Sequence, residues 1–284
     1  MCSGSGTAEC ARAVLQKTIN ESGLVDWDMD IRTVCQWEYE PKCWPVLRDM
    51  HDWGMGVLGR SERSPCLFGD IMDLNPSSVL HGASSYATKK RRVLESRMPI
   101  WCVCLAHHAP DDPYPLCAIP EKLDSGCSGL PCQDMSRAGL RMMSAGRTAP
   151  VYMTHAKFVL QKKIPLLTVE CTPDLDMDMM YDLHSDRYQW YRLVTGPADV
   201  GHRALARQRV YCIGAHTELT TRLHDPTEVL NAVSARMKHT VQTRVSDYLC
   251  ASDYEVLLEA QQVAIRRKVP FKPRCLDLRY LLTS

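Results

Sequence analysis

The sequence predicts an α/β fold built on a doubly wound, mostly parallel sheet. Short apolar runs typical of buried strands alternate along the chain with segments of helical periodicity. Turn-forming residues follow several of the strand-like runs, as they do where a parallel strand leads into its crossover helix. The 284 residues are sufficient to bury a sizeable hydrophobic core without disulfides.

Each expected element rests on its own local pattern. Apolar runs predict strands at 33–38, 66–71, 99–106, 164–169 and 209–214. Apolar residues at helical spacing predict helices from residue 8, at 151–163, from residue 226 onward and at 254–268. Two stretches, 72–100 and 107–124, lack either pattern and are expected to be irregular.

These elements predict one core over residues 1–214, with an insertion at about 72–124. Residues 215–284 are expected to form a short helical C-terminal tail. The 34 basic and 33 acidic side chains give a net charge of +1. This balance excludes a protein that holds nucleic acid by bulk positive charge, while a local basic groove remains compatible with it.

The N-terminal residues lack the charged and apolar regions of a secretory signal. The longest apolar run, Met98–Ala106, is far shorter than the roughly 20 residues of a membrane-spanning helix. We therefore expect no membrane partner, and a location that is nuclear in a eukaryotic cell and cytoplasmic otherwise. The 14 cysteines are then expected to be reduced and mostly buried.

One cysteine, Cys132, is flanked by residues that are typical of a tight turn. Pro131-Cys132-Gln133 follows Ser128-Gly129 and precedes Ser136 and Gly139. On a turn between a strand and a helix, a thiol can gain thiolate character from the helix dipole and attack an electrophilic carbon. The alternative is a structural cysteine buried beside a proline turn.

The segment Gly129-Leu130-Pro131-Cys132-Gln133-x-x-Ser136-x-x-Gly139 resembles the nucleophile segment of DNA cytosine carbon-5 methyltransferases. Other segments follow in the order of that family, over roughly residues 1–214. They are Ser3-Gly4-Ser5-Gly6, similar to its cofactor turn; Glu38-Tyr39, similar to its ribose acid and adenine-stacking residue; Asp70-Ile71, similar to its adenine-edge contact; Glu170, similar to its glutamate; and Arg207-Gln208-Arg209 with the strand that follows, similar to its arginine pair.

The resemblance implies a Rossmann-like core that uses S-adenosylmethionine to methylate cytosine in DNA. Cys132 would attack carbon 6 of a base swung out of the duplex. Glu170 would engage ring N3 and the amino group, and Arg209 the carbonyl oxygen. Gln133, Ser136 and Arg207 would contact DNA, Arg207 at a backbone phosphate.

The implied cofactor site consists of Ser3, Gly4, Gly6, Glu38, Tyr39, Asp70 and Ile71. Glycines allow the backbone to pass close to a ligand at a helix start. Glu38 would accept hydrogen bonds from ribose hydroxyls, and Tyr39 offers a flat ring to adenine. The full dinucleotide-binding fingerprint, G-x-G-x-x-G, is not matched, because Glu9 occupies the position of its third glycine. A G-x-G turn by itself is also common in proteins that bind no ligand there.

Several features depart from the family pattern. The strand expected before the cofactor turn is missing, Cys171 replaces an asparagine after Glu170, and Leu205 replaces a glutamine before Arg207. Residues 215–284 leave little room for a target-reading domain and resemble at most a remnant of one, so we expect a core cut short at both ends. Two alternatives remain open: an impaired remnant that acts only in binding, and a transfer-RNA cytosine methyltransferase.

The predicted insertion contains residues that zinc commonly binds. Four of them are close together along the chain: Cys102, Cys104, His107 and His108. Cys117 and Cys127 follow later in the sequence. Their spacing is irregular, and alternate residues of a strand share a face with or without metal. We therefore assign no metal site from the sequence, and zinc-dependent nucleic-acid binding through this insertion stays open as a third alternative.

Overall fold

The computed structural model describes residues 4, 6–107, 115–136, 139, 141–203, 205–248 and 251–273. The chain divides into two compact units. The larger unit consists of residues 1–196 and 207–232, and the smaller one of residues 197–206 and 233–284. Strand β8 (Arg209–His216) ends two residues beyond the predicted end of the core.

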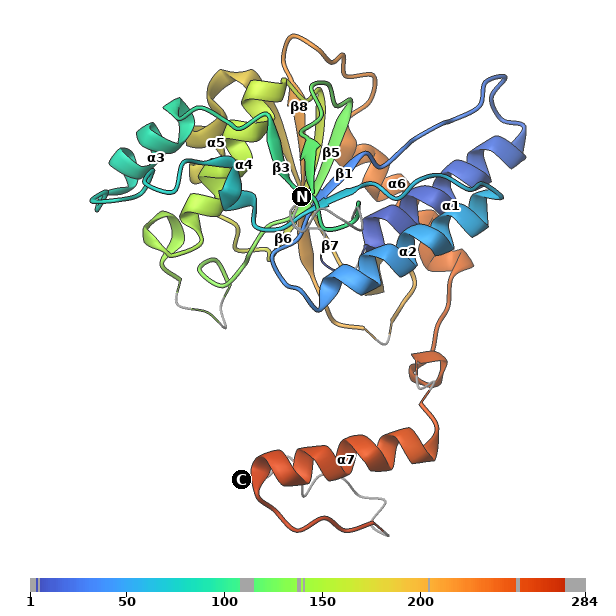
Figure 1. Ribbon diagram of the computed structural model, residues 1–284. Helices are drawn as coiled ribbons and strands as arrows, with labels where there is room; N and C mark the ends of the chain where they lie inside the picture. Colours follow the sequence, from blue (N-terminus) through green and yellow to red (C-terminus); the bar gives the residue numbers. More distant parts are fainter. Residues whose placement is uncertain are drawn as a thin grey trace. The chain divides into compact units, whose positions relative to one another are not determined.

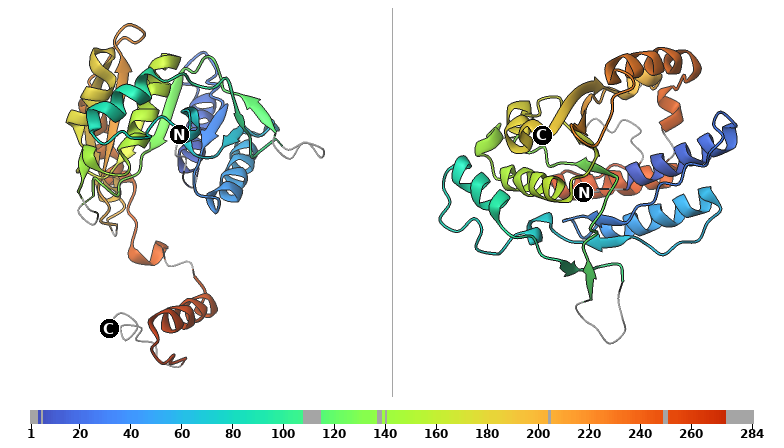
Figure 2. Two further views of the ribbon diagram at one scale, coloured as in Figure 1. Left: turned by 60° about the vertical axis from the view of Figure 1, so that its left-hand side comes forward. Right: turned by 90° about the horizontal axis from the view of Figure 1, so that it is seen from above.

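The larger unit is a mixed α/β structure. Its helices are α1 (Thr7–Ser22), α2 (Cys43–Leu58), α3 (Tyr86–Glu95), α4 (Ala149–Lys162) and α5 (Met177–His184). Its strands are β1 (Cys35–Trp37), β2 (Cys66–Phe68), β3 (Trp101–Val103), β4 (Leu116–Ala118), β5 (Ser125–Gly129), β6 (Leu166–Cys171), β7 (Tyr188–Thr195) and β8 (Arg209–His216). Helices α3, α4 and α5 lie on one side of the strands, and α1 and α2 lie on the other (Figure 1). Figure 2 shows α1 and α2 side by side.

The strands form three small sheets. Strands β1 and β2 pair in parallel, β3 and β4 form an antiparallel pair, and the largest sheet has the order β5-β6-β8-β7. In this largest sheet only β5 and β6 are parallel. The structure therefore confirms a mixed α/β fold but does not confirm a doubly wound, mostly parallel sheet. The antiparallel β7–β8 pair has a simple reason: the described part of its connection has no crossover helix, which a parallel pair needs.

Two segments predicted to be irregular contain regular structure. Helix α3 begins where the side chain of Ser85 accepts a hydrogen bond from the backbone N–H of Thr88. Only Val93 of this helix is fully buried, so its sequence carries little apolar periodicity. Strand β4 lies in the predicted proline-rich loop and pairs with β3. Both elements depend on packing that local sequence does not show.

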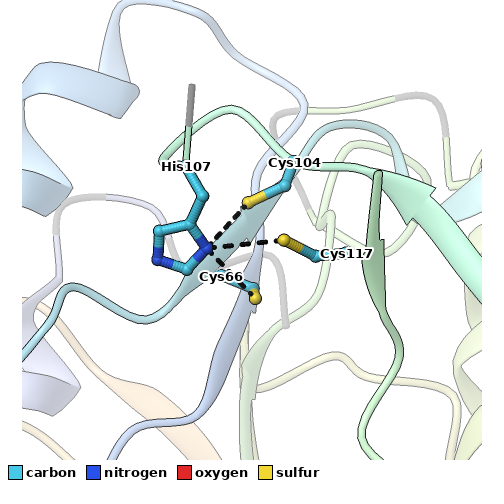
Figure 3. Close-up of side chains that lie close together, drawn as sticks. All are labelled: Cys66, Cys104, His107 and Cys117. Atoms are coloured by element: carbon cyan, nitrogen blue, oxygen red, sulfur yellow. Dashed lines mark hydrogen bonds between the residues drawn. The ribbon is translucent and has the colours of Figure 1, made fainter. Parts of the chain in front are cut away.

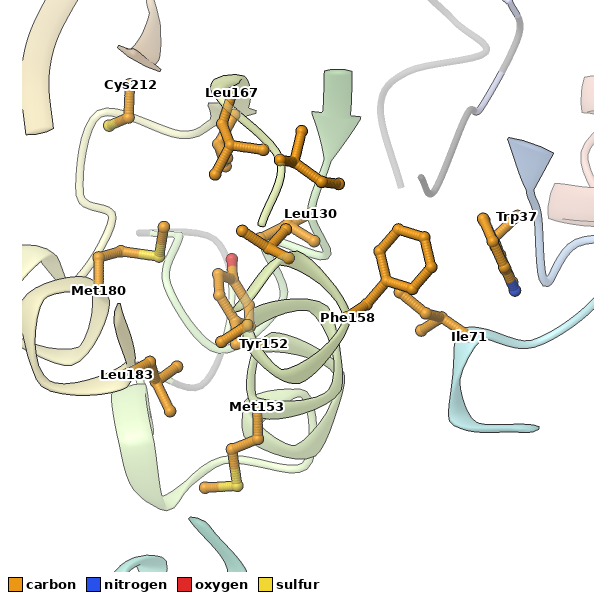
Figure 4. Packing of buried hydrophobic residues seen from close by; sticks show 14 of the residues in the cluster. Trp37, Ile71, Leu130, Tyr152, Met153, Phe158, Leu167, Met180, Leu183 and Cys212 are labelled. Carbon is orange, nitrogen blue, oxygen red and sulfur yellow. The ribbon is translucent and has the colours of Figure 1, made fainter. Parts of the chain in front are cut away.

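The core of the larger unit is built around α4. Most of this helix is buried, from Ala149 to Val159. The Trp37 ring from β1 lies 4.8 Å from the Phe68 ring and 4.9 Å from the Phe158 ring, measured between centroids. Figure 4 shows Trp37, Phe158 and Ile71 gathered on one side of α4. These aromatic contacts join the β1–β2 pair to the helix that covers the larger sheet.

Two neutral histidines lie inside this core. His184 is fully buried, its Nδ1–H donates to the carbonyl of Met180 at 2.9 Å, and its ring packs 4.9 Å from that of Trp190. Burial lowers the pKa of His184 to about 4. Burial and the neighbouring His184 also lower the pKa of His155 well below its ordinary value. Both rings therefore stay neutral in the folded protein at neutral pH.

We expect His184 to make the protein less stable in mild acid. The unfolded chain takes up a proton on this residue below about pH 6.5, whereas the folded chain does so only near pH 4, so its contribution is lost as pH falls through that window. Chemical denaturation at about pH 7.5 and about pH 5 should show a loss of about 2 kcal/mol from this residue. The variant His184→Phe should show a correspondingly smaller pH dependence. An equal dependence in both proteins would contradict this explanation.

The smaller unit contains short helical segments. Helix α6 (Pro226–Thr240) begins in the larger unit and ends in the smaller one. Helix α7 (Asp253–Arg267) begins with a capping box between Ser252 and Glu255. Its buried residues, Ala260 and Ala264, pack against Val263, Val269 and Phe271. Among the described residues, no helix is both long and apolar enough to cross a membrane.

Candidate active site

Cys132 lies on a turn three residues beyond the end of β5. The backbone N–H of Leu130 donates to the carbonyl of Glu170 at 3.2 Å, which ties this turn to β6. The carbonyl of Cys132 accepts hydrogen bonds from Met135 N at 3.0 Å and Ser136 N at 2.8 Å. The thiol is half-buried. No helix follows directly, because α4 begins only at Ala149, so the expected activation of Cys132 by a helix dipole lacks its helix in the described residues.

A buried carboxylate holds this turn to the start of α4. Asp134 is 4% exposed, and its Oδ2 accepts hydrogen bonds from both N and Oγ1 of Thr148, each at 2.7 Å. Gly139 packs so tightly that a Cβ there would lie 1.8 Å from the carbonyl oxygen of Gln133. The motif glycine therefore has a packing reason, and Asp134 is a positioning residue that the sequence motif did not single out.

We expect Asp134→Ala to destabilise the protein by about 3 kcal/mol, because the N–H and hydroxyl of Thr148 would lose their shared acceptor in a buried place. Urea denaturation of the variant and the wild type measures this difference. The variant Asp134→Asn keeps one acceptor oxygen and should lose less. An unchanged free energy of unfolding in Asp134→Ala would show that these bonds do not hold the turn.

Glu170 and Arg209 form an ion pair beside the Cys132 turn. Nε of Arg209 lies 2.8 Å from Oε1 of Glu170, with the two side chains 21% and 36% exposed. Glu170 is the penultimate residue of β6, and Arg209 begins the neighbouring antiparallel strand β8. Burial raises the pKa of the next residue, Cys171, and the nearby Cys132 raises it further. Thiol, carboxylate and guanidinium thus gather at one end of the sheet.

The predicted DNA contacts lie around this group. Arg207 is exposed and precedes β8. On the Cys132 turn, Gln133 is exposed and Ser136 is half-buried. The structure therefore leaves the Arg207 side chain accessible to a large partner.

Part of the predicted cofactor site is also brought together. The backbone N–H of Gly4 donates to Oε2 of Glu38 at 2.7 Å, and that of Glu40 donates to Oε1 at 2.9 Å. Gly4 and Gly6 have φ angles of 57° and 73°, which favour glycine. A Cβ on Gly6 would lie 3.0 Å from Cβ of Met50. Ser3 lies outside the described residues.

The other predicted cofactor residues have different environments. Asp70 follows β2, and its Oδ1 accepts a hydrogen bond from the backbone N–H of Met72, which caps a short 3-10 helix. Ile71 is buried in the core, so only its backbone is available to a ligand. Tyr39 is 72% exposed, which leaves its ring free to stack. A glycine turn, a carboxylate and an exposed ring at adjacent strand ends fit a nucleoside-type ligand.

The structure brings only part of the cysteine and histidine set of the predicted insertion together. Cys104, His107 and Cys117 lie close to Cys66, which belongs to β2 (Figure 3). Sequence reasoning missed Cys66 because it lies far from the others along the chain. Cys102 and Cys127 are not part of this cluster, and His108 lies outside the described residues.

The fold is that of a mixed α/β protein, with a thiol, a carboxylate and a guanidinium at one end of its largest sheet. The family model for C-5 cytosine-specific DNA methylases matches residues 111–268, which is more than half of the chain. The chain therefore belongs to the C-5 cytosine-specific DNA methylase family and is a DNA cytosine-5-methyltransferase. No curated protein matches it. The matched range includes Cys132, Glu170 and Arg209, whereas the glycine turn and Glu38 precede it.

Proposed function

We propose that this protein methylates carbon 5 of cytosine in DNA through a covalent adduct between Cys132 and a base turned out of the duplex. One observation carries the proposal: the Glu170–Arg209 pair lies beside the Cys132 turn within the range that matches the DNA methylase family. Cytosine has a carbonyl oxygen, a ring nitrogen N3 and an amino group on one edge. A guanidinium can donate to the carbonyl oxygen, and a carboxyl group can hydrogen-bond to N3 and the amino group.

Cys132 supplies the nucleophile. Carbon 5 of cytosine reacts poorly with a methyl donor, so the thiolate first forms a bond to carbon 6 and makes carbon 5 electron-rich. Carbon 5 then takes the methyl group and loses its proton to a base, and the bond between sulfur and carbon 6 breaks. The thiolate is regenerated in this last step.

Glu170 and Arg209 stabilise the ring during this sequence. As the sulfur adds, negative charge moves into the ring toward N3 and the carbonyl oxygen. Glu170 engages ring N3 and the amino group, and the Arg209 guanidinium donates to the carbonyl oxygen. The exposed Arg207 contacts a phosphate, which positions the strand without reading its sequence.

S-adenosylmethionine, the methyl donor of this family, supplies a methyl group on a positively charged sulfur when it is bound. Glu38 would hold the ribose hydroxyls, with its carboxylate already placed by Gly4 and Glu40. The exposed Tyr39 ring would stack on the adenine, and Asp70 would accept from its amino group.

The test is transfer of labelled methyl groups from S-adenosylmethionine to three substrates. These are duplex DNA, the same duplex with every cytosine replaced by 5-methylcytosine, and transfer RNA. The proposal expects label in the first duplex only. Transfer to RNA alone would replace it with the transfer-RNA alternative. Calorimetry without any heat of S-adenosylmethionine binding, together with no transfer, would support a remnant that acts in binding only.

A further inference from the structure

Four side chains form a compact group at the junction of β2, β3 and β4, which we name the Cys3His cluster. Its members are Cys66, Cys104, His107 and Cys117. Their ligand atoms all lie within 4.8 Å of one another, and Figure 3 shows the three sulfur atoms turned toward one ring nitrogen. Cys104 is fully buried, and the other three residues are partly buried.

The backbone brings these residues together from separate segments. Cys66 begins β2, and Cys117 is the middle residue of β4. Cys104 follows β3, forms a bridge with Phe68 of β2, and has its N–H bonded to the carbonyl of Pro115 at 2.7 Å. The cluster therefore lies where the β3–β4 hairpin meets the edge of β2.

Hydrogen bonds to His107 do not by themselves account for the position of all three thiols. Nδ1 of His107 lies 3.5 Å from the sulfur of Cys104, 3.5 Å from that of Cys117 and 3.6 Å from that of Cys66. A neutral imidazole nitrogen has a single lone pair and accepts one well-directed hydrogen bond. Three equidistant thiols around it leave two without that acceptor.

The other ring nitrogen fixes which atom is free to bind a cation. Nε2 of His107 lies 2.8 Å from the carbonyl oxygen of Ser64. A carbonyl only accepts, so Nε2 carries the proton and Nδ1 presents its lone pair to the sulfurs. In metal sites, a histidine that binds the metal through one ring nitrogen usually donates a hydrogen bond from the other, often to a backbone carbonyl. His107 has this arrangement.

The three distances between Nδ1 of His107 and the sulfur atoms match one coordination geometry. With ordinary Zn–S and Zn–N bond lengths, sulfur and nitrogen ligands lie about 3.6 Å apart in a tetrahedral site and about 3.1 Å apart in an octahedral one. The three distances from Nδ1 of His107 agree with the tetrahedral value. Three thiolates and one imidazole also form a ligand set that zinc favours.

We propose that the Cys3His cluster binds a structural zinc ion. Four protein ligands close the coordination shell, which leaves no position for a substrate and separates this site from the chemistry of Cys132. Strands β3 and β4 have three residues each and would be marginal as an isolated hairpin. The metal would fasten this hairpin to β2, whose last residue precedes Asp70 by two positions. Metal binding would thus support the expected adenine end of the cofactor site.

Elemental analysis of the full chain, purified without a metal-binding tag, tests the proposal. We expect about one zinc ion per chain in the wild type. The variants Cys117→Ser and His107→Ala should lose the metal. The matched control Cys127→Ser, which changes an exposed cysteine outside the cluster, should keep it. A folded wild type without zinc, or a Cys117→Ser variant that retains as much zinc as the control, would overturn the proposal.

A second measurement needs no variant and so does not depend on whether a substituted chain folds. Cobalt(II) exchanged into the wild-type protein should give the intense visible bands of a tetrahedral site together with sulfur-to-metal charge transfer. Weak octahedral bands without charge transfer would overturn the proposal. Both measurements leave methyl transfer aside, so their result is independent of the proposed function.

Discussion

Substitution of Cys132 by alanine is expected to abolish methyl transfer, with a loss of at least about 10⁴-fold, the scale on which removal of a nucleophile acts. The physical reason is that carbon 5 becomes reactive only after a thiolate has added to carbon 6. Because Cys132 is half-buried on a turn held by Leu130 and Asp134, alanine should leave the fold intact. Transfer of labelled methyl groups to duplex DNA measures the loss.

A duplex that carries 5-fluorocytosine tests directly whether Cys132 forms a covalent bond to the base. When S-adenosylmethionine is supplied, carbon 5 takes the methyl group but fluorine cannot leave as a proton would. The bond between sulfur and carbon 6 then persists, so the wild-type protein should remain attached to the DNA on a denaturing gel. The Cys132→Ala variant should form no such adduct, whereas Cys127→Ser should form it normally. Normal methylation by Cys132→Ala would disprove the role of this cysteine.

Substitution of Glu170 by glutamine is expected to lower the methylation rate by about 10²- to 10³-fold, as removal of one group that stabilises developing charge does in other enzymes. Glutamine keeps the size of the side chain but loses the carboxyl group that pairs with Arg209 at 2.8 Å. Single-turnover kinetics with saturating DNA separates this effect from weaker binding. A suitable control is Glu218→Gln, which removes a more exposed ion pair with Arg187.

The double variant Glu170→Gln/Arg209→Gln distinguishes a joint role from two separate ones. If both side chains act on the same ring, the loss in the double variant should be clearly smaller than the product of the single losses. Full multiplicativity would mean that the ion pair in the structure is not used as a unit. Unfolding by urea should differ little among these variants, because partly exposed ion pairs contribute little to stability.

The sequence was most informative where a local pattern coincides with structure. Helix α4 and the strands that carry Glu170 and Arg209 were predicted within a few residues, because their apolar runs are long and buried. The same patterns could not give strand direction. Whether β8 runs parallel or antiparallel to β6 depends on the connection between them, which its residues do not encode locally.

The rest of the site depends on contacts between residues far apart in the sequence. Asp134 looks like any acidic turn residue until its carboxylate is seen to accept both hydrogen bonds of Thr148. Cys66 could not be grouped with His107 because only the pairing of β2 with the hairpin brings them together. Similarly, the bond from Gly4 to Glu38 joins two segments that lie 34 residues apart in the sequence.

The hydrogen bond from Leu130 to Glu170 has a consequence for how such chains can diverge. It fixes the pairing of β5 with β6, so that the segment leading to Cys132 lies directly beside Glu170. One residue inserted into β6 before Glu170 would turn that carboxylate to the opposite face of the sheet. Related chains should therefore change in length within the connections around the sheet, while the spacing along β5 and β6 stays constant.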